Sequence, residues 1–353
     1  MASPDLLPAY AELHCLSNFS FLRGASHPEE LVERAKSQGY AALALTDECS
    51  LAGAVRAHLA AKDASLPLIL GSELTLADGM KLVLLATDRA SYGDLSQLIT
   101  RGRRNAVKGT YRLTRDDVAS VASTCIALWF PALDLRAASG SDTLHDAGFI
   151  RDVFADRGRI GVELLAQAGD VARLAQCRAL SQATGVPLVA AGDAHMHVRA
   201  RRALQDTLTA IRRKETLADC GRALHPNGER HLRSRARLAG VYPPELLAET
   251  LVVAQQCRFS LEELRYEYPE EIVPPGETAG SWLRKLVERG LASRYGMPET
   301  TSVTAEPVAS NVDSDMLLRG DSAFRCTTAP ANVRALIEHE LALIANSVTS
   351  RTS

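Results

Sequence analysis

The chain has 353 residues, of which 46% are hydrophobic and 23% are charged, as in a globular protein large enough for one or two domains. The formal net charge of −2 excludes a polycation that coats nucleic acid along its whole length, although it allows local basic patches. The seven cysteines form no Cys-x-x-Cys pair, no signal peptide is visible, and no apolar stretch is long enough to span a bilayer, so we expect a reduced cytoplasmic protein without membrane contact.

Apolar, strand-like runs alternate with amphipathic segments over roughly the first 215 residues. A helix is expected to begin near His27, because Ser26 and Glu29 have capping-box spacing and Pro28 suits a first turn, and to end at Gly39. Asp170 is expected to cap another helix, which ends at Gly185. Further helices are expected over 51–64 and 198–214. The expected strands are 10–15, 41–46, 68–74, 81–87, 124–130, 159–165 and 187–192.

Buried strands that alternate with helices indicate an α/β protein with a parallel sheet or barrel. Seven strands favour a distorted seven-stranded (βα) barrel, with an open sheet as the alternative. In such barrels the chemistry lies where strands end and loops begin.

The C-terminal part differs in character. We expect a first domain over 5–258 and a short helical connector over 259–295, with a helix at 281–294. Residues 296–353 form a divergent tail, whose stretch 296–330 is rich in Ser, Thr, Ala and Pro and is expected to be disordered. One helix is expected near 332–345.

Polar residues gather at the ends of the expected strands. His14 lies near the end of the first expected strand and Glu73 near the end of the third, and Asp193 and His195 follow the last. Residues two apart on a strand point to the same face, so Asp193 and His195 can aim at one ion. Carboxylate and imidazole ligands together suit zinc, manganese or iron. Each element alone is weak, since a single Asp-x-His is more often structural than metal-binding.

Several separated segments, in order, resemble the PHP domain that opens bacterial C-family DNA polymerases, most closely the error-prone, DnaE-type subfamily. The resemblance covers about 5–295, and ALIEHELALIA near the end of the chain also resembles the family. The segments that carry it are YAELHCLSNFSFLRGASHPEELVERAKSQGYAALALTD, GSELTLADGMKLVLLA, GVELLAQ, GVPLVAAGDAHMHVRARRALQDTLTAIR, PNGERHLRS and LRYEYPEEIVPPG.

The family's metal-binding pattern is only partly present. The resemblance implies His14, Glu73, Asp193 and His195 as surviving ligands, with Glu48 as a further candidate where the family has histidine. At three ligand positions this chain has other residues: Leu16, Arg23 and Lys81. The surviving set is expected to hold one divalent ion at most, zinc or manganese.

Two of the replacements are cationic, which suggests a hypothesis. Carboxylates left behind by a lost ion are costly to bury unpaired, so Arg23 and Lys81 would supply the missing positive charge as an ion-pair network. The alternative is that both side chains point to solvent. Intact family members are linked to proofreading or pyrophosphate hydrolysis, and little of either is expected here.

Basic clusters occur along the chain, and most are expected to be solvated helix faces. The best candidate for contact with nucleic-acid phosphates is the cluster of Arg230, Arg233, Arg235 and Arg237.

The resemblance implies the N-terminal domain of an error-prone polymerase that acts in damage-induced mutagenesis and translesion synthesis, on a chain that looks truncated before its palm domain. The catalytic carboxylates and their Mg²⁺ would lie in the missing part, so this chain alone is not expected to polymerise. Implied partners are the rest of the polymerase, primer-template DNA, a sliding clamp and mutagenesis accessory proteins. Two alternatives stay open: a free-standing metal-dependent phosphoesterase, and an inactive remnant or partner-binding module.

Overall fold

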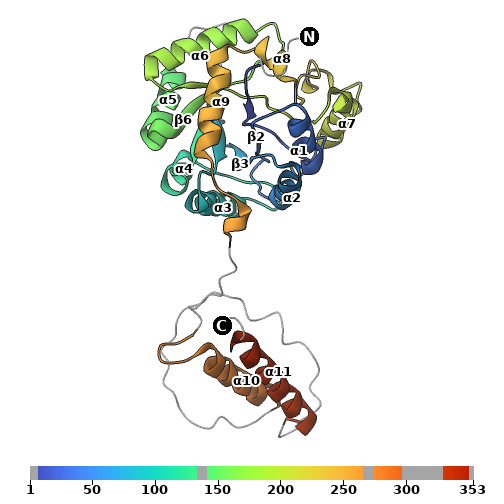
Figure 1. Ribbon diagram of the computed structural model, residues 1–353, viewed down its shortest axis with the longest axis vertical. Coiled ribbons are helices and arrows are strands. Elements are labelled where there is room, and N and C mark those ends of the chain that lie inside the picture. The colour runs from blue at the N-terminus through green and yellow to red at the C-terminus, as the bar shows by residue number, and fades with distance from the viewer. Residues whose placement is uncertain (1–6, 133–140, 265–272, 296–328, 350–353) are drawn as a thin grey trace. The chain divides into compact units, whose positions relative to one another are not determined.

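The computed structural model describes residues 7–132, 141–264, 273–295 and 329–349 (Figure 1). The chain divides into two compact units, Met1–Arg265 and Tyr266–Ser353. Among the described residues, no helix has both the length and the apolar character needed to cross a bilayer.

The first unit is built on one seven-stranded sheet whose strands follow one another in chain order. Neighbouring strands pair in parallel except around β4, which runs antiparallel to both β3 and β5. The strands are β1 (Ala11–Glu12), β2 (Ala42–Leu45), β3 (Leu68–Thr75), β4 (Lys81–Leu85), β5 (Ile126–Phe130), β6 (Gly158–Val162) and β7 (Leu188–Ala190). The α/β class and the seven strands predicted from the sequence are confirmed.

The all-parallel arrangement expected from the alternating pattern is wrong at β4. A tight turn joins β3 to β4: Leu76 N–H donates to the carbonyl oxygen of Met80 at 2.9 Å, and Gly79 adopts φ +90°. A turn this short can only connect antiparallel strands, because a parallel crossover needs a dozen or more residues. The start of β4 therefore lies at the edge of the sheet where the other strands end, with Thr75 opposite Lys81.

The sheet curls until the ends of its first and last strands meet. Cys15 and Ala194 form a parallel bridge, in which Leu16 N–H donates to the carbonyl oxygen of Ala194 at 2.8 Å. Close by, the carboxylate of Glu12 accepts from Gly192 N–H at 2.8 Å. A Cβ atom at Gly192 would lie 2.1 Å from Glu12 Oε2, so any larger residue there would displace the Glu12 carboxylate. This closure at one end gives the distorted barrel character expected from the sequence.

Helices surround the strands (Figure 1). α6 ends at Gly185, which has φ 76°, as predicted, but the predicted cap at Asp170 is wrong, because the N-cap is Gly169 and Asp170 is the first helical residue. α1 is capped one residue later than predicted, at His27, whose N–H donates to Glu30 Oε2 at 2.9 Å. The helices of this unit are α1 (Pro28–Ser37), α2 (Ala54–Ala64), α3 (Arg89–Arg104), α4 (Arg115–Val121), α5 (Ser141–Phe154), α6 (Asp170–Thr184), α7 (Arg202–Arg213), α8 (Arg235–Ala239) and α9 (Pro244–Gln256), with the short 3₁₀ turns η2 (Ala155–Arg157), η3 (Arg199–Arg201), η4 (Gly221–Ala223) and η5 (Leu261–Glu263).

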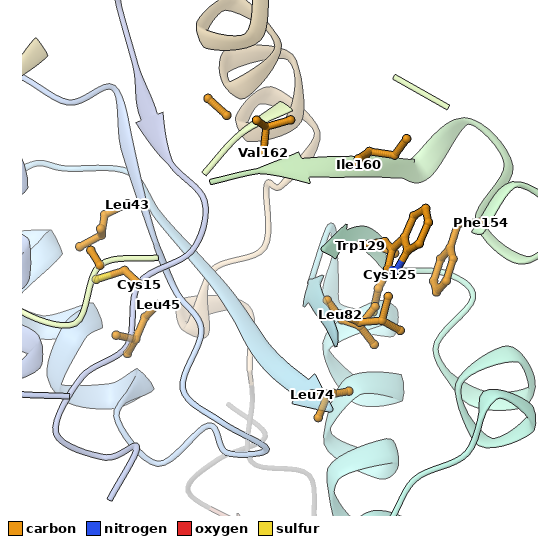
Figure 2. Packing of buried hydrophobic residues seen from close by; sticks show 14 of the residues in the cluster. Cys15, Leu43, Leu45, Leu74, Leu82, Cys125, Trp129, Phe154, Ile160 and Val162 are labelled. Atoms are coloured by element: carbon orange, nitrogen blue, oxygen red, sulfur yellow. The ribbon is translucent and has the colours of Figure 1, made fainter. Parts of the chain in front are cut away.

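Both faces of the sheet are buried, because alternate residues of the strands belong to two different buried clusters. Leu43 and Leu82 belong to the larger core cluster, which the surrounding helices cover, and Figure 2 shows them with Trp129 and Phe154. Their neighbours Ala44 and Val83 belong to a second cluster that includes Val253 of α9. Burial on both sides explains why the strands read as continuous apolar runs in the sequence.

The second unit contains two described helices, α10 (Ala279–Tyr295) and α11 (Ala331–Thr349). Arg284 makes a two-pronged ion pair with Glu338, at 2.7 and 2.9 Å, and so joins the two helices. Helices lie at both places where the sequence predicted them, 281–294 and 332–345. The disorder predicted for 296–330 falls almost entirely on residues 296–328, outside the described part of the chain.

Candidate metal centre

Three of the predicted ligands lie together at the edge of the sheet where most strands end. His14, Glu73 and Asp193 are all buried, and each offers a ligand atom within 4.8 Å of the other two. They come from three elements, since His14 follows β1, Glu73 lies in β3 and Asp193 follows β7. The curl of the sheet brings β1 and β7 close enough for this arrangement.

His14 is fully buried and faces carboxylates with both ring nitrogens. Nε2 lies 2.8 Å from Glu73 Oε2 and 3.6 Å from Asp193 Oδ1. Nδ1 lies 3.3 Å from Oε1 of Glu163. Burial alone would raise the pKa of Glu73. The hydrogen bond from the His14 imidazole and the charge of Lys81 outweigh this effect and hold the pKa of Glu73 well below its usual range.

His195 lies beside this cluster and has a defined tautomer. Its Nδ1 is 3.1 Å from Gln205 Nε2, and its Nε2 is 3.0 Å from Asp193 Oδ1. An amide nitrogen only donates, so Nδ1 accepts and Nε2 carries the proton given to Asp193. Burial, together with the charge of Arg23, lowers the pKa of His195 well below its usual value. The imidazole is therefore neutral near pH 7.

Arg23, one of the three replaced ligand positions, points into the site. Its Nη1 contacts Glu73 Oε1 and lies 2.6 Å from Glu48 Oε2. The loop that carries it is closed tightly, because a Cβ at Gly24 would meet the carbonyl oxygen of Ser17 at 1.9 Å. The carbonyl oxygen of Arg23 accepts from Gln205 Nε2 at 2.8 Å, which ties the loop to α7.

Lys81, the second cationic replacement, also points inward. Its Nζ lies 3.2 Å from Glu73 Oε2, 3.4 Å from Glu163 Oε1 and 3.9 Å from Asp193 Oδ1. Leu16, the third replacement, is fully buried. The alternative in which Arg23 and Lys81 face solvent is wrong in this structure.

Two residues of the site were not predicted from the sequence. Glu163 directly follows β6, and its carboxylate reaches both His14 and Lys81. Burial would raise the pKa of Glu163, but the charge of Lys81 and the hydrogen bond from His14 lower it instead. An acidic residue at a strand end was a usable signal, the same one that identified Glu73. Arg230 pairs with Asp193, which nothing local in the sequence indicates.

The basic cluster of residues 230–237 is not the exposed patch expected for nucleic-acid contact. Arg230 is turned towards Asp193, and Arg233 is only 1% exposed. Arg233 donates to the carbonyl oxygen of Leu164 and stacks over Tyr242, so its predicted phosphate contact is wrong. Arg235 Nη1 lies 3.4 Å from the carbonyl oxygen of Leu7. Arg237 keeps a side chain that is 50% exposed.

The site opens onto a cleft of about 350 Å³. Charged and polar side chains line it almost entirely, and the Cβ-branched Thr75 lies at its edge. The lining residues are Arg23, Glu48, Glu73, Thr75, Lys81, His195, Gln205, Arg212 and His225. Burial is the main cause that lowers the pKa of His225 to about 4, so this imidazole is also neutral near pH 7.

The donor atoms suit a divalent ion, but in this arrangement they are already engaged. At 2.8 Å from Glu73, Nε2 of His14 donates a hydrogen bond and has no lone pair to offer an ion. Glu73 is held by Arg23 and Lys81, Glu163 by Lys81, and Asp193 by Arg230. The residues as they stand do not fit a bound metal.

Comparisons with known proteins show what the chain is similar to. Residues 12–139 match the PHP domain family. The chain is 54% identical over 344 residues to an error-prone DNA polymerase of Dechloromonas aromatica, an alignment that covers 96% of this chain and 30% of that protein. It is 52% identical over 289 residues to an error-prone DNA polymerase of Pseudomonas aeruginosa, covering 82% of this chain and 27% of the relative.

Among solved structures, a metal-dependent phosphoesterase of Bifidobacterium adolescentis aligns with 17% identity and a TM-score of 0.42, over 54% of this chain and 89% of its own. The chain spans about 30% of the length of the polymerases it matches. It therefore contains a PHP domain and is a homologue, over nearly its whole length, of part of the bacterial error-prone DNA polymerases.

Proposed function

We propose that this chain is the PHP region of an error-prone DNA polymerase and serves that enzyme as a structural domain. The observation that carries the proposal is the 54% identity over 96% of the chain to a protein of that name. Nucleotide addition, with its Mg²⁺, belongs to the rest of the polymerase, where paired carboxylates hold the ions at the primer end. The candidate metal centre within the domain of residues 5–258 helps to stabilise that domain, because its carboxylates are paired with side-chain cations.

This proposal includes the finer expectations from the sequence. The polymerase works in the cytoplasm on primer-template DNA at damaged positions, during damage-induced mutagenesis and repair. Its partners are a sliding clamp and mutagenesis accessory proteins. Residues 259–295 connect the PHP region to the following domain of the polymerase. On the surface of residues 230–237, the half-exposed Arg237 would contact a DNA phosphate by exchanging its ion pair with Glu229 for one with the phosphate.

A chimeric enzyme tests the proposal. The matching segment of the Dechloromonas aromatica polymerase is replaced by this chain, and primer extension is measured on undamaged and abasic templates with Mg²⁺. The chimera is expected to extend both templates at rates within about tenfold of the parent, since the domain only supports the fold. This chain alone is expected to extend neither. A folded but inactive chimera, or extension by the chain alone, would contradict the proposal.

A second function, metal-dependent phosphoester hydrolysis, is favoured by one observation. His14, Glu73 and Asp193 have ligand atoms within 4.8 Å of one another. Hydrolysis of a phosphodiester substrate with added Mn²⁺ tests this function. We expect no turnover above the protein-free rate. Clear turnover that is abolished in His195→Ala would favour the hydrolase instead.

A further inference from the structure

The ammonium group of Lys81 lies among the oxygens that a metal ion would need. Its Nζ is 3.2 Å from Glu73 Oε2, 3.4 Å from Glu163 Oε1 and 3.9 Å from Asp193 Oδ1. These carboxylates come from three strands of the sheet or their ends. One monovalent cation is thus surrounded by three anionic groups, as a divalent ion would be in an oxygen-rich site.

The fold holds the ammonium in this place. Lys81 is the first residue of β4 and lies opposite both Thr75 of β3 and Phe130 of β5. Its Nζ lies 5.1 Å from the centre of the Phe130 ring, within the range of a cation–π contact. The same ring lies 5.0 Å from that of His14. The aromatic ring therefore supports both the ammonium and the imidazole, and the side chain of Lys81 is only 27% exposed.

Two arginines complete the charge balance on either side of Lys81. Arg23 contacts Glu73 and Glu48, and Arg230 contacts Asp193. The four carboxylates Glu48, Glu73, Glu163 and Asp193 thus face three cationic side chains and the imidazole of His14. Buried carboxylates without such partners would be costly. Among these cations, Lys81 is the one that contacts three of the carboxylates at once.

We propose that Lys81 masks a latent metal site formed by His14, Glu73, Glu163 and Asp193, and that removing its ammonium group lets a divalent ion bind there. Glu163 is the fourth ligand, a role that its sequence position alone did not reveal. Without Lys81, the three carboxylate oxygens that face its ammonium group, one each on Glu73, Glu163 and Asp193, are open to an ion. The other oxygens of Glu73 and Asp193 stay paired with Arg23 and Arg230. The inference rests on the PHP-domain part of the proposed function and is independent of DNA synthesis.

Metal content measured on the full chain tests the inference. Wild type, Lys81→Ala and Lys81→Arg are incubated with MnCl₂ or ZnCl₂, desalted and analysed for metal by mass spectrometry. Wild type and Lys81→Arg are expected to retain less than about 0.1 ion per chain, and Lys81→Ala about one. Mn²⁺ at about 100 times its Kd should raise the Tm of Lys81→Ala by roughly 5 °C or more and leave that of wild type unchanged.

Two further variants locate the bound ion. Lys81→Ala combined with Glu163→Gln should lose most of the gained metal, because it removes the fourth ligand. Lys62→Ala, which removes an exposed lysine paired with Glu262, should behave as wild type. If Lys81→Ala folds only when Mn²⁺ is present, the ion replaces the ammonium and the proposal is supported.

Any of three results would overturn it: about one ion per chain in wild type, no gain of metal in Lys81→Ala, or a Lys81→Ala chain that stays unfolded with and without metal. If the folded chimera does not extend primers but the metal results are as expected, the proposed function is contradicted and this inference stands.

Discussion

Arg233 donates a hydrogen bond to the carbonyl oxygen of Leu164 at 2.8 Å, from a side chain that is almost fully buried. The guanidinium also lies over the ring of Tyr242, whose hydroxyl donates to the carbonyl oxygen of Ala191 at 2.8 Å. This arginine therefore links the loop after β6 to the segment after β7. It acts in the interior of the domain, in a stretch whose sequence looks like a basic surface.

Replacing Arg233 should destabilise the domain strongly. Arg233→Met leaves the carbonyl oxygen of Leu164 unsatisfied and loosens the packing against Tyr242, so we expect a loss of about 3 kcal/mol in the free energy of unfolding. Arg104→Met is the matched control, because this arginine lies exposed in the last turn of α3, and should cost less than about 0.5 kcal/mol. Urea unfolding followed by circular dichroism measures both. Equal losses in the two variants would contradict the buried role.

The turn between β3 and β4 should be more stable with glycine than with alanine at position 79. Gly79 has φ +90°, and a methyl group added there would meet nothing within 4 Å, so Gly79→Ala adds backbone strain alone, about 1 kcal/mol. Gly93 lies in the middle of α3 with equally open surroundings. Gly93→Ala should stabilise by up to about 1 kcal/mol, because alanine is the better helix former. Thermal unfolding of both variants tests whether the signs are opposite.

The start of α3 should contribute a pH-dependent stability. Asp88 Oδ1 accepts from Ser91 N–H at 2.8 Å, and such hydrogen bonds lower the pKa of Asp88 below its usual value. A carboxyl whose folded pKa is lowered stabilises above its unfolded pKa and loses that contribution as the pH falls through the folded value. Asp88→Ala should therefore cost about 1 kcal/mol at pH 7 and progressively less below about pH 4.

Asp88→Asn separates the cap from the charge. Asparagine still accepts the hydrogen bond from Ser91 but does not titrate, so it should cost only a few tenths of a kcal/mol at pH 7. The measurement is chemical unfolding at several pH values between 7 and 3. A cost for Asp88→Ala that stays constant down to pH 3 would show that the carboxylate charge has no part in the cap.

Chelator treatment should leave the wild-type domain unchanged. The carboxylates of Glu73, Glu163 and Asp193 are paired with side-chain cations, so the folded domain needs no metal ion to balance their charge. We expect the Tm before and after EDTA treatment and desalting to agree within about 1 °C. A fall of several degrees that Mn²⁺ or Zn²⁺ restores would mean that wild type depends on a metal.

Much of the architecture could be read from the sequence, because its signals are local. The glycine that ends α6, the seven apolar runs and the polar residues at their ends all depend on neighbours a few positions away. Lys81 was harder to place. Its inward direction depends on β4 running antiparallel, and an alternating pattern of strands and helices suggests the opposite.

Other site features depend on partners far along the chain. Arg230 and Arg233 look like members of one basic patch, yet they pair with Asp193 and with the carbonyl oxygen of Leu164. No spacing within residues 230–237 distinguishes the buried arginines from the exposed Arg237. Glu163 could have been found, because it follows an apolar run just as Asp193 does.

The contact between Glu12 and Gly192 has an evolutionary consequence. The carboxylate of Glu12 fills the space where any side chain at position 192 would begin, and it accepts the N–H of that residue. A mutation at either position therefore changes which residues are permitted at the other. Across the relatives of this chain, substitutions at these two positions should be inherited as pairs, with larger residues at 192 found only where position 12 has become small.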